Sequence, residues 1–236
     1  MNMEMKNRIL VVDDDKEIAN LLRVTLQNEG YEVDMVYNGM DALKQINDIK
    51  YDLAILDVMM PGMDGYMLCS KIREKYFFPI MMVTAKGTDI DKITGLMMGA
   101  DDYMVKPFHP MEVAMRVKAQ LRRNQMYSKG VAQNAEITEY EIGELFVSKR
   151  TRICTLEGKE IELTPTEFDI LWYLCEKNGE VVTSEELFEH VWGEKYYENN
   201  NTVMAHITRI REKMHEIPRK PRYIKTVWGV GYKIEQ

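Results

Sequence analysis

The sequence predicts two domains of different fold classes: an α/β domain built on a doubly wound parallel sheet, and a smaller α+β domain after it. Two observations predict them. In the first half, short apolar runs alternate five times with segments whose apolar residues recur at helical spacing. After residue 136, short alternating strands and three helical segments replace this pattern. A chain of 236 residues is long enough for each domain to bury its own core.

The first half is predicted to contain five strand–helix units. We expect short apolar strands near residues 8–12, 31–36, 53–56, 79–84 and 103–106, and helices before Gly30 and near 39–48, 65–75, 88–99 and 110–123. In the first helix Ile18, Leu21, Leu22 and Leu26 recur at helical spacing, and Gly30 ends it. Such alternation implies parallel strands, right-handed crossovers and helices on both faces of the sheet.

The second half begins after residues 125–136, which lose all periodicity and are predicted to be a linker between domains of residues 1–124 and 137–236. Alternating segments at 145–147, 152–156 and 160–163 predict a small antiparallel sheet. Three helices are expected, from Thr164 to near Gly179, from Thr183 to near Gly193, and over 202–216; the first two begin with capping signals. A glycine-turned hairpin over 223–234 follows. Three helices and a terminal hairpin form a winged helix-turn-helix.

Composition favours a cytoplasmic protein with an anionic partner. No apolar stretch of about 18 residues is present, and the first residues lack the apolar segment of an export signal. The three cysteines (69, 154 and 175) have no CxxC spacing and are expected to be reduced core thiols. The net charge of −7 divides unevenly, with +5 in residues 201–236 and −12 elsewhere. This asymmetry indicates a local anion-binding face.

Acidic residues follow two strands of the predicted parallel sheet. Asp13 and Asp14 end the first strand and Asp57 ends the third, so three carboxylates are expected in one crevice. Three carboxylates at such short distances from one another require a cation to offset their charge. Hard oxygen ligands without His or Cys favour Mg²⁺. A carboxylate beside Mg²⁺ can act as a nucleophile toward a phosphoryl group. From its own stretch alone, Asp57 could equally be a helix cap or a solvated loop acid.

Two further strand ends carry groups that suit phosphoryl chemistry. Lys106 ends the fifth strand and Thr84 ends the fourth, where they could hold the transferred oxygens. Each residue also has a simpler interpretation. Lys106 could be a solvated cation and Thr84 an ordinary cap, and Asp15 is expected to be a cap.

Four motifs of the first half resemble the receiver domain of two-component response regulators: Val-Val-Asp13-Asp14, Leu-Asp57-Val-Met-Met-Pro-Gly-Met-Asp-Gly, Val-Thr84-Ala and Gly-Ala-Asp-Asp-Tyr103-Met-Val-Lys106-Pro107-Phe. The second half resembles the winged-helix output domain of the OmpR/PhoB subfamily. Its segments Leu-Thr-Pro-Thr-Glu-Phe and Tyr-Ile-Lys-Thr-Val-Trp-Gly-Val-Gly-Tyr-Lys-Ile are similar to the VanR branch, which controls vancomycin-resistance operons. The resemblance covers nearly the whole chain.

The resemblance implies a DNA-binding transcriptional regulator whose partners are a sensor histidine kinase, promoter DNA and RNA polymerase. Asp57 would accept the phosphoryl group from a phosphohistidine. Asp14 and Asp57 would bind Mg²⁺ directly, Asp13 through water, and the Met59 carbonyl would complete the set. The resemblance further implies that Thr84 and Tyr103 form a conformational switch, and that the Lys106–Pro107 peptide bond is cis and aims the ammonium into the site.

Another class of protein uses the same chemistry. Aspartyl-phosphate hydrolases of the haloacid-dehalogenase type need a general acid two residues after the nucleophile, where this chain has Met59. The sequence therefore favours a regulator that is not an enzyme.

A charged surface on the first domain matches the dimer face of the family. The pairs implied are Lys92–Glu112, Asp102–Arg116 and Asp101–Lys118. On the helix after the fifth strand, Val113, Val117 and Leu121 are expected to face inward, with Glu112 and Arg116 four apart on the outer side. A solvated charged helix is the alternative, since surface ion pairs are individually weak.

The third helix of the second domain is the expected DNA-reading element. Val203, Ile207, Ile210 and Met214 form its buried stripe, and the groove face is predicted to carry Asn201, Thr202, Ala205, Thr208 and Arg209. Arg209 alone could hold guanine O6 and N7 in a bidentate contact. Arg211 and Lys213 are expected to contact phosphates, as are Lys225 and Lys233 on the hairpin.

Two questions about this domain stay open in the sequence. Trp228 stands where some relatives place an Arg that enters the minor groove; its ring could contact sugar, and a packing role under the hairpin turn is favoured. The module could also bind a protein rather than DNA, although the charge of residues 201–236 argues against that alternative.

Overall fold

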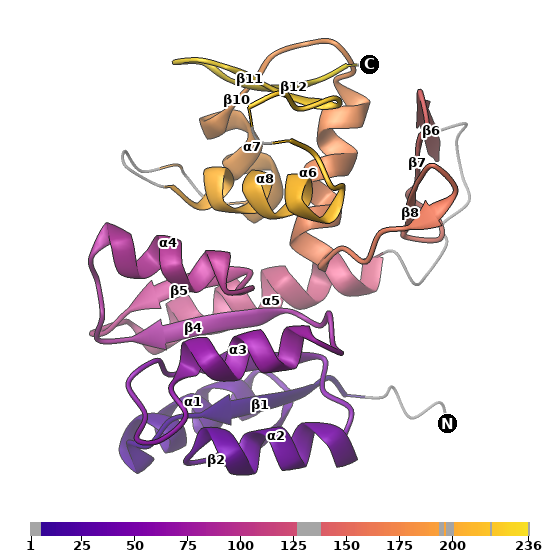
Figure 1. Ribbon diagram of the computed structural model, residues 1–236. Coiled ribbons are helices and arrows are strands. Elements are labelled where there is room, and N and C mark those ends of the chain that lie inside the picture. The colour runs from indigo at the N-terminus through magenta and orange to yellow at the C-terminus, as the bar shows by residue number, and fades with distance from the viewer. Residues whose placement is uncertain (1–5, 127–137, 194–195, 197–200, 218, 236) are drawn as a thin grey trace. The chain divides into compact units, whose positions relative to one another are not determined.

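The computed structural model describes residues 6–126, 138–193, 196, 201–217 and 219–235, and it divides into two compact units, residues 1–121 and 122–236 (Figure 1). The predicted linker, residues 125–136, lies almost wholly outside the described residues. No helix within the described ranges combines the length and apolar character that a membrane span requires.

The first unit contains the predicted five-stranded parallel sheet. Its strands are β1 (Arg8–Val12), β2 (Glu32–Val36), β3 (Leu53–Leu56), β4 (Ile80–Thr84) and β5 (Asp102–Val105), in the order β2-β1-β3-β4-β5. The helices are α1 (Lys16–Asn28), α2 (Gly39–Asp48), α3 (Gly65–Arg73), α4 (Asp89–Met97) and α5 (Pro110–Met126). The predicted fold class is confirmed, and α5 extends three residues beyond its predicted end.

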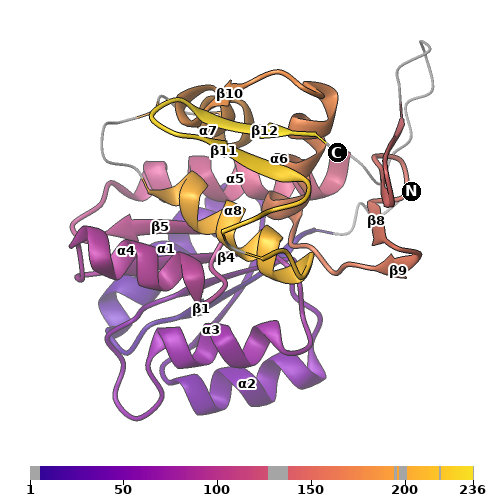
Figure 2. The same ribbon diagram turned by 45° about the horizontal axis from the view of Figure 1, so that its top comes forward.

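Helices cover both faces of this sheet. Apolar side chains of α1 and α5 pack with Ile9, Val11 and Ile55 in one core, and α2, α3 and α4 lie on the other face (Figures 1 and 2). Every residue of β3 is buried, as its continuous apolar run predicts. Leu21 departs from the predicted stripe of α1: it is exposed, while Leu22 and Leu26 are buried.

The second unit has two antiparallel sheets and three helices. The strands β6 (Glu139–Ile142), β7 (Leu145–Ser148), β8 (Ile153–Leu156) and β9 (Lys159–Glu160) form one sheet. The helices are α6 (Pro165–Glu176), α7 (Ser184–Trp192) and α8 (Thr202–Lys213). The hairpin of β11 (Ile224–Val227) and β12 (Gly231–Ile234), yellow in Figure 2, pairs with β10 (Val182–Thr183). Residues 139–142 and 182–183 were not predicted as strands, and α8 ends three residues before its predicted end.

Capping explains where two of these helices begin. The Thr164 side chain accepts a hydrogen bond from the Glu167 backbone N–H while the Glu167 carboxylate accepts one from the Thr164 backbone N–H, so the predicted capping box is confirmed. The Thr183 side chain accepts from the Glu186 N–H at the start of α7. A single apolar core joins all three helices to the hairpin through residues such as Val203, Ile207 and Ile224.

Candidate functional site

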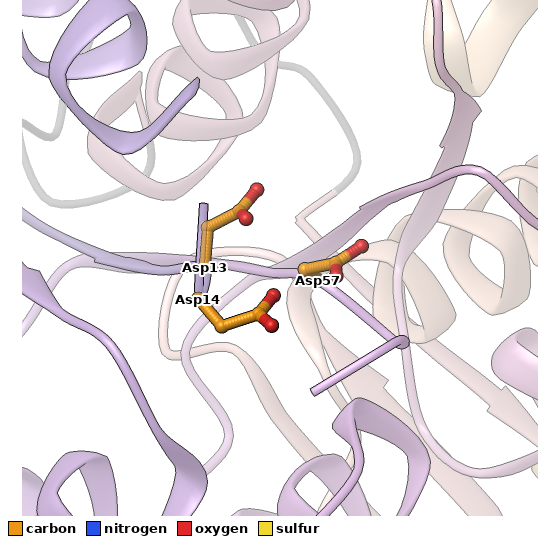
Figure 3. Close-up of side chains that lie close together, drawn as sticks. All are labelled: Asp13, Asp14 and Asp57. Carbon is orange, nitrogen blue, oxygen red and sulfur yellow. The ribbon is translucent and has the colours of Figure 1, made fainter. Parts of the chain in front are cut away.

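Three carboxylates meet at the carboxyl edge of the parallel sheet. Strands β1 and β3 are neighbours, with Val12 opposite Leu56, so Asp13 and Asp57 leave the sheet side by side. The Asp57 backbone N–H donates to the Val12 carbonyl over 2.8 Å, which fixes their register. Carboxylate oxygens of Asp13, Asp14 and Asp57 lie within 4.8 Å of one another (Figure 3). The predicted convergence of the three acids is confirmed.

The ammonium of Lys106 closes this acid cluster. It lies 2.7 Å from Asp13 Oδ2 and 3.4 Å from Asp57 Oδ1, and its side chain is largely buried. Lys106 is therefore not a solvated cation. The Lys106–Pro107 peptide bond is cis, as the resemblance implies.

The cluster fits a divalent metal ion by its charge and donor types. Three carboxylates face one ammonium, so negative charge remains uncompensated in a site where Asp13 and Asp57 are buried. Burial raises the pKa of Asp13, and the nearby Lys106 ammonium opposes that shift. Hard oxygen donors without His or Cys match the preference of Mg²⁺.

Asp57 has one oxygen engaged and one available. Its Oδ2 accepts the Met59 backbone N–H over 3.1 Å, while Oδ1 is buried and has no hydrogen-bond partner among the described residues. The Lys106 contact to Oδ1 is an ion pair at 3.4 Å rather than a hydrogen bond. A buried carboxylate oxygen without a donor is costly, and a bound group at this oxygen would remove that cost.

Thr84 and Tyr103 lie on neighbouring strands beside this site. Thr84 is fully buried, and its Oγ1 accepts the Lys86 N–H over 3.4 Å. The Tyr103 hydroxyl donates to the Lys86 carbonyl over 3.0 Å and lies 3.5 Å from the hydroxyl of Tyr66. Burial first, and then the Tyr66 hydroxyl, raise the pKa of Tyr103. Tyr66 was not predicted as a site residue, because only the fold brings its hydroxyl beside that of Tyr103. Asp15 is a helix cap, as expected.

The predicted dimer face is partly corrected. Arg116 pairs with Asp102 at 3.1 Å and with Glu112 at 3.3 Å, both within one chain, while Val113, Val117 and Leu121 face inward as predicted. Asp101 is fully buried and pairs with Arg73 at 2.7 Å, so the Asp101–Lys118 pair is wrong. Lys118 is exposed, and Lys92 lies 3.7 Å from Asp89.

The face of α8 that is open to solvent also differs from the prediction. The buried stripe of Val203, Ile207, Ile210 and Met214 is confirmed. Ala205 and Arg209 are buried as well, and the Arg209 guanidinium lies 2.9 Å from the carboxylate of Glu167, which is fully buried on α6. The prediction that Arg209 faces a groove is therefore wrong in this structure. Asn201, Thr202 and Thr208 are partly exposed, and Met204 is exposed.

The cations predicted to contact phosphates are engaged within the unit. Lys213 lies 2.7 Å from Glu167, and the Arg211 guanidinium donates to the Ile224 carbonyl and to the Thr226 hydroxyl. On the hairpin, Lys225 donates to the Pro221 carbonyl and Lys233 pairs with Glu235 at 2.6 Å.

Trp228 is 89% exposed at the tip of the hairpin. The favoured packing role under the hairpin turn is therefore wrong, because the ring makes little contact with the rest of the unit.

Family models match both halves of the chain. Residues 9–118 match the response regulator receiver domain, and residues 158–234 match the C-terminal domain of transcriptional regulatory proteins. A receiver joined to such a domain defines a two-component response regulator with a DNA-binding output. The chain belongs to the response regulators of the OmpR/PhoB type, and this assignment is favoured over both a hydrolase and a protein-binding output module.

Individual relatives narrow the assignment to the VanR regulators. Regulatory protein VanRc of Enterococcus gallinarum is 57% identical over 232 residues, which cover 98% of this chain and 100% of that protein. Regulatory protein VanR of Enterococcus faecium is 50% identical over 233 residues, with the same coverage. The crystal structure of DrrB, an OmpR/PhoB homologue from Thermotoga maritima, is 34% identical with a TM-score of 0.51 and covers 98% of this chain and 100% of its own.

Proposed function

We propose that Asp57 is the phosphoacceptor of this response regulator, with a sensor histidine kinase as the donor. The buried Asp57 Oδ1 that lacks a hydrogen-bond donor is the observation that carries the proposal. In the transfer, this oxygen forms a bond to phosphorus while the bond between phosphorus and the donor imidazole nitrogen breaks, and the imidazole leaves with the electron pair. Lys106, whose ammonium lies 3.4 Å from Asp57 Oδ1, would hold one of the transferred oxygens, and the Thr84 hydroxyl would hold another.

Asp13, Asp14 and Asp57, with the Met59 carbonyl, would hold Mg²⁺ at this site. The ion supplies positive charge that offsets the carboxylates and the incoming phosphoryl oxygens. Lys106 already offsets part of that charge, through its ion pairs with Asp13 and Asp57.

The second part of the proposal concerns the output. Domains of residues 1–124 and 137–236, joined by 125–136, would act as receiver and DNA-binding halves of a regulator that dimerises on phosphorylation. Its target would be promoter DNA, with vancomycin-resistance genes suggested by the similarity to VanR and VanRc. The regulator would act in the cytoplasm with RNA polymerase, and the role is that of a regulator rather than an enzyme.

Incorporation of phosphate tests the first part. Full-length protein incubated with Mg²⁺ and radiolabelled acetyl phosphate should acquire one base-labile phosphate, and Asp57→Asn should abolish it because the amide is not a nucleophile. Asp64→Asn is the matched control: Asp64 caps α3, and Asn caps a helix equally well. That variant should label like the wild type, and chelation of Mg²⁺ should prevent labelling. Wild-type labelling of Asp57→Asn would refute the assignment.

A further inference from the structure

In the N-terminal half of α8, the most exposed side chain is apolar. Met204 is 44% exposed, and Thr208 follows one turn later and is partly exposed. The Thr208 hydroxyl donates to the Met204 carbonyl over 2.9 Å, so it is bonded back to its own helix. Its one proton is therefore used within the helix, and the Thr208 side chain offers an outside partner a methyl group and an acceptor oxygen but no donor.

Arg209, the α8 residue best suited to contact guanine, is engaged in an ion pair within the protein. Arg209 pairs with Glu167 at 2.9 Å, and Glu167 is a fully buried carboxylate that also binds Lys213 at 2.7 Å. A bidentate contact of Arg209 with guanine O6 and N7 would have to break this pair and leave a buried carboxylate short of a cation.

The other exposed residues of α8 that the structure describes do not supply a guanine contact in place of Arg209. A recognition helix presents its N-terminal residues to the base edges, which places Met204 and Thr208 nearest the bases and the exposed Glu212 farther away. At the N-terminal end, the Asn201 side chain makes no capping hydrogen bond with the part of α8 that the structure describes, and an Asn amide pairs with adenine N6 and N7. Arg211 donates to the hairpin.

We propose that Met204 and the Thr208 methyl group are specificity-determining residues that contact the C5-methyl groups of thymines in the major groove. This inference rests on the proposed DNA-binding function and deepens it. Thymine is the only standard base that presents a methyl group there, and apolar side chains are its partners. The protein should therefore select A·T pairs where the N-terminal half of α8 enters the groove.

Removal of single methyl groups from DNA tests the proposal. Full-length protein treated with Mg²⁺ and acetyl phosphate is used to select duplexes from a randomised library, and each thymine of a selected duplex is then replaced by deoxyuridine. At one or two positions the affinity should fall about four-fold, as expected for one apolar carbon group that is no longer buried. Met204→Ala and Thr208→Ser should each lose this sensitivity at one position.

Thr208→Val is the matched control, because it keeps a methyl group and removes the hydroxyl; it should retain the wild-type response to deoxyuridine. If no position responds to deoxyuridine, or if Met204→Ala and Thr208→Ser respond like the wild type, the proposal is overturned although DNA binding stands. Selected sites dominated by guanines whose preference disappears in Arg209→Lys would also overturn it. Failure to select any duplex would instead refute the DNA-binding function.

Discussion

Glu167 is a charged residue at the centre of the DNA-binding unit. It is fully buried, caps α6 through the Thr164 N–H, and pairs with Arg209 and Lys213 on α8. Burial alone would raise the pKa of Glu167, but the charges of Arg209 and Lys213 outweigh it and lower the pKa to about 2. Because these cations lie four residues apart, Glu167 holds two successive turns of α8.

This lowered pKa predicts how stability depends on pH. The carboxylate contributes stability above its unfolded pKa of about 4.3, and that contribution is lost as pH falls toward about 2. Glu167→Gln should cost roughly 3 kcal/mol at neutral pH, because it leaves two cations with a neutral partner. Between about pH 4.5 and 2, the free energy of unfolding of this variant should fall less than that of the wild type. Urea unfolding at several pH values measures both.

Glu157→Gln is the control for Glu167→Gln, since Glu157 pairs with Arg222 at the surface. Such a pair is worth about 0–1 kcal/mol. Equal stability of the two variants at neutral pH would contradict the role assigned to Glu167.

Trp228 offers a second prediction at the scale of one side chain. Trp172 and Trp192 are 5% and 3% exposed, whereas Trp228 is 89% exposed, so only Trp228 should be accessible to acrylamide. If the hairpin contacts DNA, addition of a selected duplex should reduce the quenching of tryptophan emission. Trp228→Phe should abolish the quenchable component. Unchanged quenching, with binding confirmed by anisotropy of labelled DNA, would exclude the hairpin tip from the interface.

At the scale of elements, a contact between α3, α4 and β5 holds Tyr103. The Tyr66 hydroxyl on α3 donates to the Asp91 carbonyl on α4 over 3.1 Å and lies 3.5 Å from the Tyr103 hydroxyl. Gly95 makes room for the Tyr103 ring: a Cβ at residue 95 would lie 2.8 Å from that ring and 2.7 Å from Met82 Sδ.

Gly95→Ala should therefore destabilise the receiver by about 1–3 kcal/mol, although alanine favours a helix, because the added carbon overpacks the Tyr103 ring. Thermal unfolding measures the effect. Thr94→Ala, one residue away on the same helix, adds no atoms and should leave stability within about 0.5 kcal/mol. If Gly95→Ala were as stable as Thr94→Ala, the Tyr103 ring would not be confined as described.

The receiver site was predictable from sequence because a parallel sheet brings its strand ends to one edge. Asp13, Asp57 and Lys106 each follow or end a strand, so assigning the strands was enough to predict that these side chains lie close together. The face of α8 was not predictable by the same logic. Arg209 is oriented by Glu167, a residue 42 positions earlier on another helix, and no periodicity within α8 reveals that partner.

One of the two strands that were not predicted, β10, depends on a distant partner. It is two residues long and pairs with β12 about 50 residues later, and the strand preference of Val182 and Thr183 is too short a signal to reveal that pairing. Propensity is a weak guide for segments of this length.

At the level of the whole molecule, the net positive charge of residues 201–236 overestimates the number of cations that are available to neutralise phosphates. Five of its eight cations form ion pairs within the chain: Arg209, Arg211, Lys213, Arg222 and Lys233. Pairing reduces the net number of phosphates that they can neutralise. The salt dependence of DNA binding should therefore be shallower than eight free cations would give.

Dimerisation is the last property of the whole molecule that the structure makes testable. In one chain Arg116 is paired with both Asp102 and Glu112, so a dimer built on this face must exchange those pairs across the interface. Arg116→Glu would place three acids together and should lower dimer formation by phosphorylated protein. Asp102→Arg in the same chain should partly restore it, as a charge reversal of the pair.

Lys118→Glu is the matched control for Arg116→Glu, because it makes the same charge change on the same helix. Its predicted partner Asp101 is buried against Arg73, so we expect Lys118 to contribute less to the proposed interface than Arg116 does. Sedimentation velocity with Mg²⁺ and acetyl phosphate should show a loss of dimer for Arg116→Glu and none for Lys118→Glu. Equal loss in both would mean that the net charge of α5, rather than the Asp102–Arg116 pair, governs association.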